Sequence, residues 1–440
     1  MEDNKISISL LPNEYLMIDK AAIVKKIKDA SCKDDVSVED IEYLARVLSG
    51  VQVSGELDDY IFDLDRALDI CGKIGGVCYN PEGFDKLYHE DPEKTQKRID
   101  MTINNGHHSV YDHIFISFNM RNIPKILAMV LNNEKQYTTS EKSARYTKVA
   151  SQSGASITKE EQELYNKWVD IFKIKIKEKY GYQFNDRKIE KLAQENARYL
   201  VTVFMPTTFI YTTSLRQINN LAAFMKDYIA NANQNDKFQV RLADSMKEVL
   251  HELSRVNVLD SRLMTNNKER KFSLFGKDLA NKNEYFGDVY STNYKASFAE
   301  LAQAQRHRTL DYQMERLDDK EFFVPPIIED DDLLSQEWLR DIKSVSGLAP
   351  QGEKVLVNES GKYDDFKLKL KERLCSAAQL EINNQTKETL TKYRDALVAA
   401  NHPLKDDIEK YTHGARCTFP DFTCTEDCHF AEGKRLIRKI

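Results

Sequence analysis

The spacing of hydrophobic and polar positions along the chain alternates between a helical and an extended period. Apolar residues recur every three to four positions in six segments of the first 256 residues, which predicts amphipathic helices at 18–30, 37–50, 160–180, 189–203, 214–230 and 238–256. Alternation predicts strands at 5–11, 113–120 and 207–213. In 113–120 we expect Ile114, Ile116 and Phe118 on one face and His113, Phe115 and Ser117 on the other. A helix over 93–106 is expected to end at Gly106.

After about residue 257 the same order of patterns starts again. Strands are predicted near 272–276 and 284–294, a helix over 297–308, an extended stretch over 321–328 and one long helix over 365–400. The ends of the two halves are comparable, FQVRLADSMKEVL against AQLEINNQTKETL, which indicates an internal duplication. We therefore predict an α+β fold of two modules, 1–256 and 257–440, with an insertion at about 20–66 in the first.

Composition narrows the class of protein. With 440 residues, 41% apolar content and a net charge of −6 spread along the chain, the sequence has a globular composition and no basic arm for nucleic acid. No apolar run approaches the roughly 20 residues that a membrane span needs, and the N-terminal residues lack the order of a signal peptide. We expect a cytoplasmic protein that does not bind membranes, with its seven cysteines as thiols.

A cationic triplet, Arg306-His307-Arg308, is the first candidate for chemistry. Two forked, permanently charged donors around an imidazole suit a phosphate or an electron-rich ring, although cations also favour the end of a helix for electrostatic reasons alone. Gln303 lies one helical turn earlier and would face the same way, where its amide could read the edge of a base.

A second candidate is the polar stretch 140–146. Glu141, Ser143 and Arg145 occupy alternate positions, so in an extended chain all three side chains would point into one pocket. A carboxylate acceptor, a hydroxyl and a guanidinium group would suit a phosphorylated sugar. An ordinary capping loop would have the same sequence pattern. Three further arginines interrupt helical apolar patterns and could be ion-paired or ligand-binding: Arg198, Arg216 and Arg373.

Histidine and cysteine positions give weaker indications of a functional site. His113 could contact a ring or handle a proton, although a structural histidine is the more frequent case. The spacing of Cys417, Cys424 and Cys428 does not match a zinc ribbon, so no metal is expected there. Neither a GxGxxG turn after a strand nor a Walker loop is present, which argues against a Rossmann-type nucleotide site.

Taken together, these motifs resemble the flavin-dependent thymidylate synthases of the ThyX type. The first half carries GHHSVYDH at 106–113, SEKSARY at 140–146, ENAR at 195–198 and SLRQINN at 214–220. The second half carries AQAQRHRT at 302–309, EFFVPP at 321–326 and RLCSAAQLEI at 373–382. In the family, RHR is followed closely by the Ser-x-Arg-Tyr loop.

Each half lacks what the other keeps. In the first half Asn133, Glu134 and Lys135 occupy the RHR position, whereas in the second half no Ser-x-Arg-Tyr follows RHR. Such complementary losses favour one composite site built from both halves. Because family active sites lie between subunits of a homotetramer, the resemblance implies two ThyX-like modules, each a mainly antiparallel twisted sheet flanked by long helices. They would form a pseudo-dimer, and two chains would form a homodimer of pseudo-dimers.

The resemblance also assigns roles residue by residue. It implies that FAD is held by Arg306, His307, Arg308, Thr309, His113, Ser214, Arg216 and Asn220. Ser214 stands where the family often has Asn. The implied binding residues for dUMP, or a related deoxypyrimidine nucleotide, are Gln303, Glu141, Ser143, Arg145, Arg198 and Arg373. Arg373 and Ser143 are the expected catalytic residues, and no metal is implied.

The implied reaction is the reductive methylation of dUMP to dTMP, with methylenetetrahydrofolate as one-carbon donor and NADPH as reductant of the flavin. Two alternatives stay open. The rebuilt motifs could serve one-carbon transfer to another deoxypyrimidine nucleotide, for example a hydroxymethylation, or the chain could be an inactive paralogue that only binds nucleotide or flavin.

Overall fold

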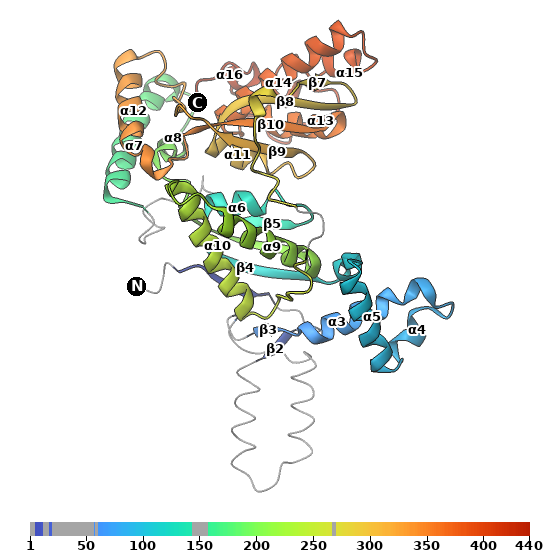
Figure 1. Ribbon diagram of the computed structural model, residues 1–440. Coiled ribbons are helices and arrows are strands. Elements are labelled where there is room, and N and C mark those ends of the chain that lie inside the picture. Colours follow the sequence, from blue (N-terminus) through green and yellow to red (C-terminus); the bar gives the residue numbers. More distant parts are fainter. Residues whose placement is uncertain (1–4, 12–16, 20–56, 58–59, 143–156, 266–269) are drawn as a thin grey trace. The chain divides into compact units, whose positions relative to one another are not determined.

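The structure, a computed structural model, describes residues 5–11, 17–19, 57, 60–142, 157–265 and 270–440 (Figure 1). The chain divides into two compact units: unit 1 comprises Met1–Lys142 and Pro206–Phe272, and unit 2 comprises Ser143–Met205 and Ser273–Ile440. Both units combine helices with antiparallel sheet, which confirms the predicted α+β class.

The compact units do not coincide with the sequence modules 1–256 and 257–440. The segment 143–205 groups with unit 2 although it belongs to the first half of the sequence, and unit 1 continues to Phe272. The compact units do not show whether the chain arose by duplication, so the module boundary at 256 stays a prediction. The inserted segment predicted at 20–66 lies mostly outside the described residues, including the helices expected at 18–30 and 37–50.

Unit 1 is built on a four-stranded antiparallel sheet with the order β1-β4-β6-β5. Its strands are β1 (Ser7–Leu10), β4 (Phe115–Pro124), β5 (Thr138–Glu141) and β6 (Pro206–Ser214). The alternation predicted for β4 is confirmed, because Ile116 and Phe118 are buried while Phe115 is 50% exposed. A separate two-stranded antiparallel sheet pairs β2 (Met17–Asp19) with β3 (Tyr60–Phe62).

Three of the helices described in unit 1 pack against this sheet. Within unit 1, α9 (Leu215–Asn231) and α10 (Lys237–Arg255) pack together and run across the sheet (Figure 1). The Ser214 hydroxyl caps α9 by accepting a hydrogen bond from the backbone N–H of Gln217, 3.1 Å away. Every residue of α6 (Lys125–Leu131) after Lys125 is buried.

A helical arm precedes β4. It contains α3 (Leu64–Gly75), α4 (Gly83–Tyr88) and α5 (Pro92–Asn104), with short 3-10 turns at η2 (Val77–Tyr79) and η3 (His108–His113). A Cβ atom at Gly72 would lie 2.6 Å from Ile99 Cγ1, so glycine permits the close approach of α3 to α5. Gly106 has a φ of +72°, which suits the predicted end of the α5 region.

Unit 2 contains a second four-stranded antiparallel sheet with the order β7-β8-β10-β9. The strands are β7 (Tyr285–Phe286), β8 (Val289–Ser297), β9 (Asp311–Arg316) and β10 (Lys354–Lys362). The central strand β10 pairs with both neighbours, so that Asn358 lies opposite Asn293 on one side and Gln313 on the other. The associated helices are α11 (Phe298–Ala304), α13 (Tyr363–Arg373) and α14 (Leu380–Ala399).

The two sheets have the same connectivity. Apart from helical inserts between β5 and β6 and between β9 and β10, the succession is β4, α6, β5, β6, α9, α10 in the first sheet and β8, α11, β9, β10, α13, α14 in the second. Both short helices have 7 residues. In each sheet the strand that follows a helical insert lies between the other two, as β4-β6-β5 and β8-β10-β9. The repeated order of the sequence patterns therefore corresponds to a repeated order of elements.

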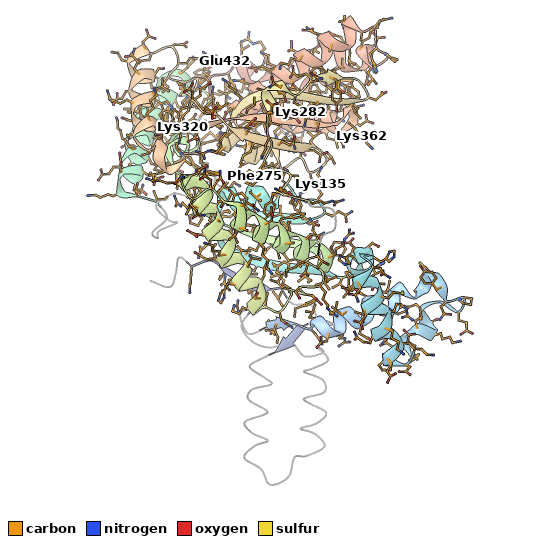
Figure 2. All side chains as sticks on the ribbon, viewed as in Figure 1. Lys135, Phe275, Lys282, Lys320, Lys362 and Glu432 are labelled. Carbon is orange, nitrogen blue, oxygen red and sulfur yellow. The ribbon has the colours of Figure 1, made fainter. Side chains whose placement is uncertain are left out.

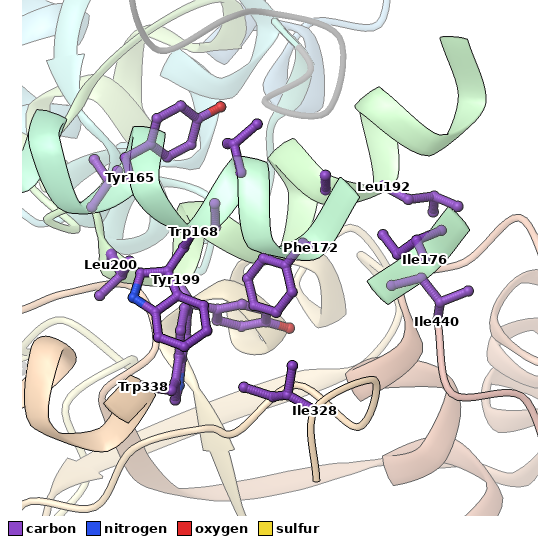
Figure 3. Close-up of a cluster of buried hydrophobic side chains, with 14 of the residues drawn as sticks. Tyr165, Trp168, Phe172, Ile176, Leu192, Tyr199, Leu200, Ile328, Trp338 and Ile440 are labelled. Atoms are coloured by element: carbon purple, nitrogen blue, oxygen red, sulfur yellow. The ribbon is translucent and has the colours of Figure 1, made fainter. Parts of the chain in front are cut away.

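The helical inserts form a second core within unit 2 (Figure 3). It joins α7 (Lys159–Tyr180) and α8 (Asp186–Ala197), which follow β5 in the sequence, to α12 (Asp332–Ser344), which follows β9. The rings of Trp168 and Trp338 pack edge to face with centroids 4.9 Å apart. Both indole N–H groups are satisfied, by Asp341 Oδ2 at 2.9 Å and by the Phe323 carbonyl oxygen at 2.8 Å.

The chain ends against this core. After α15 (Lys405–Glu409) and α16 (Ala431–Lys434), Ile440 is buried among the residues of α7 and α8. The Tyr180 hydroxyl donates to Glu432, labelled in Figure 2, over 2.7 Å. Further 3-10 turns lie at η5 (Arg198–Leu200), η6 (Leu279–Asn281), η7 (Ser346–Leu348) and η8 (Arg416–Thr418).

Two predicted elements are wrong. The segment 272–276 forms no named strand and contributes only an isolated bridge between Phe275 and Met314. The single helix predicted over 365–400 is broken between Arg373 and Leu380. The buried Asn383 side-chain amide donates to the carbonyl oxygens of Arg373 at 2.7 Å and Cys375 at 3.4 Å, which satisfies backbone groups at the break.

Candidate functional site

The cationic triplet lies in a turn after α11, and not in the helix predicted over 297–308. The backbone N–H of His307 donates to the Ala304 carbonyl oxygen at 2.9 Å as the helix ends. Arg306, Arg308 and Thr309 are exposed, whereas His307 is buried at 6% exposure. The turn therefore directs two guanidinium groups and a hydroxyl to the surface of unit 2 and the imidazole inward.

His307 fixes the arginine at the end of α13. Arg373 Nε donates to His307 Nε2 over 2.6 Å, and Arg373 Nη2 donates to the backbone carbonyl oxygen of Gln303 over 3.3 Å. Burial, with the nearby charges of Arg373 and Lys369, lowers the pKa of His307 to about 2. The imidazole is thus neutral, accepts at Nε2 and carries its proton at Nδ1, which lies 3.7 Å from Glu372 Oε2.

A chain of hydrogen bonds runs inward from Gln303. Gln303 Nε2 donates to Gln379 Oε1, and Gln379 Nε2 donates to the Tyr199 hydroxyl oxygen. The Tyr199 hydroxyl donates to Glu381 Oε2 at 2.9 Å. Glu381 also accepts from Ser297, from its backbone N–H at 2.9 Å and from its hydroxyl at 2.6 Å. This chain connects residues of α11, α14 and the segment 143–205.

Arg198 is held in the same compact unit. It begins η5 directly after α8 and is buried at 7% exposure. Burial lowers the pKa of its guanidinium, while the nearby Tyr165 and Glu195 act in the opposite direction. Unit 2 thus contains Arg198, predicted from the first half of the sequence, together with Gln303 and Arg373 from the second half.

The other predicted flavin residues lie in unit 1, around Asp112. The Ser214 hydroxyl donates to Asp112 Oδ1 at 2.6 Å, and Arg216 Nη1 donates to Asp112 Oδ2 at 2.7 Å. His113 ends η3 and is exposed; it lies in a 3-10 turn and not on the predicted strand. Asn220 lies one helical turn after Arg216 on α9, where its amide is 3.5 Å from Gln217 Oε1.

Sequence reasoning missed Asp112 as an organising residue. Its carboxylate is the shared acceptor that fixes both Ser214 and Arg216, and its position in GHHSVYDH was the available signal. Asp112 stands immediately before His113, the last residue of this motif.

The 140–146 motif is only partly described. Glu141 ends β5, where it pairs with Lys125 Nζ at 2.6 Å and accepts from Thr207 Oγ1 at 3.0 Å. Ser143 and Arg145 lie outside the described residues. Lys135, which stands at the RHR position of the first half, is exposed in the turn between α6 and β5 (Figure 2).

A buried charge cluster in unit 2 was not predicted. Lys369 and Glu359 form an ion pair of 2.6 Å with both side chains at 0% exposure, and the Tyr290 hydroxyl donates to Glu359 at 2.6 Å. Within the described part of the chain, neither carboxylate oxygen of the buried Glu300 has a hydrogen-bond partner. Burial raises the pKa of Glu300 to about 8.

Among the residues described, no helix combines the length and the apolar character needed to cross a bilayer. In the ranges given above, no group of three or more His, Cys, Asp or Glu side chains is arranged to hold a metal ion. The described cysteines are free thiols at Cys71, Cys78, Cys375, Cys417, Cys424 and Cys428.

The comparison with protein families matches the first half of the chain. The model of the family described as thymidylate synthase complementing protein matches residues 61–252. The flavin-dependent thymidylate synthase of Clostridium tetani (strain Massachusetts / E88) is 27% identical over 158 residues, covering 33% of this chain and 64% of that protein.

The family match covers only part of the chain. The chain spans less than two thirds of the length of this curated relative. The matched residues 61–252 contain His113, Glu141, Arg198 and Arg216 but end before the RHR turn. Both comparisons point to the family that the motifs resemble, and over residues 61–252 the chain is therefore ThyX-like.

Proposed function

We propose that the chain catalyses the FAD-dependent reductive methylation of dUMP to dTMP, with methylenetetrahydrofolate as one-carbon donor and NADPH as reductant. The observation that carries the proposal is the arrangement at the RHR turn. The exposed Arg306 and Arg308 flank a buried neutral His307, which orients Arg373 beside Gln303. The family match and the similarity to the flavin-dependent thymidylate synthase of Clostridium tetani support the same reaction.

The residues present fit FAD. A pyrophosphate carries negative charge, and guanidinium forks with a neighbouring hydroxyl are its natural partners; Arg306, Arg308 and Thr309 supply these at the surface of unit 2. In unit 1, Arg216 is oriented by Asp112, with His113, Ser214 and Asn220 nearby in the sequence and the fold. When bound, the flavin would supply a hydride to the pyrimidine.

The nucleotide would be bound by side chains that polarise and position it. Arg373 and Arg198 would offer permanent positive charge to the phosphate or the carbonyl oxygens, and Gln303 an amide to the base edge. Glu141, Ser143 and Arg145 complete the proposed substrate set, with Arg373 and Ser143 in catalytic roles. No enzyme nucleophile is required in this proposal, because the positive charges activate the ring toward hydride.

We further propose that the site is composite. The losses are complementary, since the first half has no RHR and the second no Ser-x-Arg-Tyr. The shared succession of elements in the two sheets supports an origin from two ThyX-like modules arranged as a pseudo-dimer. Two chains would then reproduce four modules, as a cytoplasmic homodimer of pseudo-dimers.

Visible absorbance tests the proposal directly. The purified protein, loaded with FAD and passed through gel filtration, is expected to keep a flavin spectrum, and its gene is expected to rescue a thymidine auxotroph. A colourless protein after loading would exclude a flavoenzyme. A protein that binds flavin but does not rescue the thymidine auxotroph would instead favour one-carbon transfer to another deoxypyrimidine nucleotide.

The composite site has its own test. Arg308→Ala and Arg145→Ala change opposite halves of the sequence, and each is expected to abolish turnover because removing one charged ligand contact costs about 2–5 kcal/mol. Turnover near the unsubstituted level in either variant would show that one half suffices.

A further inference from the structure

We propose that a hydrogen-bond relay, Glu381–Tyr199–Gln379–Gln303, fixes which end of the Gln303 amide faces the bound base and so selects uracil over cytosine. The inference rests on the proposed function, because it assumes that Gln303 reads the pyrimidine edge. It assigns a specificity role to Tyr199, Gln379 and Glu381, which act through Gln303 and so are positioning residues.

The direction of the relay is set at Glu381. This buried carboxyl group receives three hydrogen bonds, two from Ser297 and one from Tyr199, at 2.6–2.9 Å. The Ser297 hydroxyl also accepts from the Glu300 backbone N–H at 3.1 Å, so its single proton is directed to Glu381. An acceptor surrounded by donors obliges Tyr199 to donate its only proton to it.

The next link follows from the chemistry of a phenol. With its proton committed to Glu381, the Tyr199 oxygen can only accept, so Gln379 must present its NH₂ group to Tyr199. Tyr199 is buried at 2% exposure, and burial raises the pKa of its hydroxyl well above the usual value, which keeps the proton in place.

The last link fixes Gln303. Because Gln379 Nε2 faces Tyr199, its Oε1 faces Gln303 and accepts from Gln303 Nε2. Within the described part of the chain, Gln303 Oε1 has no hydrogen-bond partner, and the side chain is only half-buried. The relay thus holds an oxygen acceptor, and not a freely rotating amide, at the end of the Gln303 side chain that is not bonded to Gln379.

An acceptor held in place discriminates between pyrimidines. Uracil carries an N–H donor at N3, whereas cytosine has an unprotonated acceptor at N3, so cytosine would set two acceptors against each other. Sites built for one hydrogen-bond pattern reject the wrong partner strongly, because buried polar groups are left unpaired. If the amide could turn over, its NH₂ group would accommodate cytosine and the preference would fall.

The test compares dUMP with dCMP on the full-length, FAD-loaded protein. Dissociation constants for both nucleotides would be measured by isothermal titration calorimetry for the unsubstituted protein, Tyr199→Phe and Glu381→Gln. Tyr199→Phe has no hydroxyl, so it no longer fixes the orientation of the Gln379 amide. Glu381→Gln carries an NH₂ group that can donate to the Tyr199 oxygen and so reverse the donor and acceptor roles along the relay. The dCMP/dUMP ratio of dissociation constants is expected to fall about tenfold or more in both variants, with the flavin spectrum retained.

A matched control separates specificity from packing. Tyr290 is also a fully buried tyrosine of unit 2 that donates to a buried glutamate, Glu359, at 2.6 Å. Tyr290→Phe should leave the ratio unchanged. An unchanged ratio in a folded Tyr199→Phe protein would overturn the relay alone, as would an equal fall in Tyr290→Phe. If the unsubstituted protein bound neither nucleotide, the proposed function would fail and the relay with it.

Discussion

At the residue scale, Glu300 makes the stability of the fold depend on pH. Its carboxyl is fully buried, and burial raises its pKa from 4.5 to about 8. A raised pKa means that the folded state binds a proton that the unfolded state has released. Stability from this group is therefore complete below about pH 4.5 and is lost as the pH rises through about 8.

We expect Glu300→Gln to flatten this dependence. Gln is neutral at every pH, so the variant should gain stability relative to the unsubstituted protein as the pH rises from 6 to about 8, and the difference should be larger at pH 9 than at pH 6. Urea denaturation at both pH values, with Glu388→Gln on the same unit as a control for an unburied carboxylate, measures the difference. Parallel losses from pH 6 to pH 9 in both proteins would show that Glu300 does not bind the proton.

His307 is expected to act as an acceptor and not as an acid. Because its pKa is lowered to about 2, it stays neutral above that pH and accepts from Arg373 Nε. His307→Gln can keep an acceptor near the Nε2 position, whereas His307→Phe removes this acceptor from the buried guanidinium at a cost of about 1.5–3 kcal/mol. Activity should rank unsubstituted, Gln, Phe.

The pH profile provides the control for His307. The unsubstituted protein and His307→Gln should share one profile, because neither side chain titrates near neutrality. An inflection near pH 6.5 that disappears only in His307→Gln would show that the imidazole is protonated during turnover.

At the scale of elements, the helical inserts depend on a tryptophan pair. Trp338 of α12 is fully buried against Trp168 and Phe172 of α7, with ring centroids 4.9 and 5.5 Å away. Trp338→Ala is expected to lower the free energy of unfolding by about 3–5 kcal/mol, because it leaves a cavity and removes a buried hydrogen bond.

A substitution on the same helix controls for helix propensity. Leu333 lies on α12 at 79% exposure, so Leu333→Ala should change stability by less than about 0.5 kcal/mol. Guanidinium denaturation followed by tryptophan fluorescence and circular dichroism measures both. A small loss in Trp338→Ala would mean that α7 and α12 are not held by this contact.

Elements with one buried face could be predicted from the sequence, and those defined by remote partners could not. β4 alternates apolar and polar residues, so it was predicted, but β5 reads TTSE and carries no apolar signal. It is a strand because Thr138–Glu141 pair with β6. The packing of α7 in unit 2 depends on partners such as Asp341, which is 173 positions from Trp168.

The candidate site could likewise be predicted from the sequence only in part. Motif spacing identified Gln303, His307 and Arg373, and the structure joins these three by hydrogen bonds. The residues that orient them were not predicted, because Tyr199 and Glu381 contribute through contacts 182 positions apart. Asp112 was likewise visible in the sequence, but its two hydrogen bonds to Ser214 and Arg216 depend on the pairing of distant segments.

At the scale of the whole molecule, the proposed ligand set is distributed over both compact units. Unit 1 contains His113, Arg216 and Asn220, and unit 2 contains the RHR turn with Gln303 and Arg373. Neither unit carries all the groups proposed for FAD. Flavin binding is therefore expected to require both units, either from one chain or from two.

Two arginine substitutions test this expectation. Arg216→Ala in unit 1 and Arg308→Ala in unit 2 should each weaken FAD binding by about 2 kcal/mol or more, roughly thirtyfold, because each removes a charged contact to the same cofactor. Arg340→Ala changes a side chain of unit 2 that is 73% exposed and should leave FAD affinity unchanged. Titration of the apoprotein with FAD measures all three. If only Arg308→Ala weakened binding, the flavin would be held by unit 2 alone, and Asp112 would orient Arg216 for another purpose.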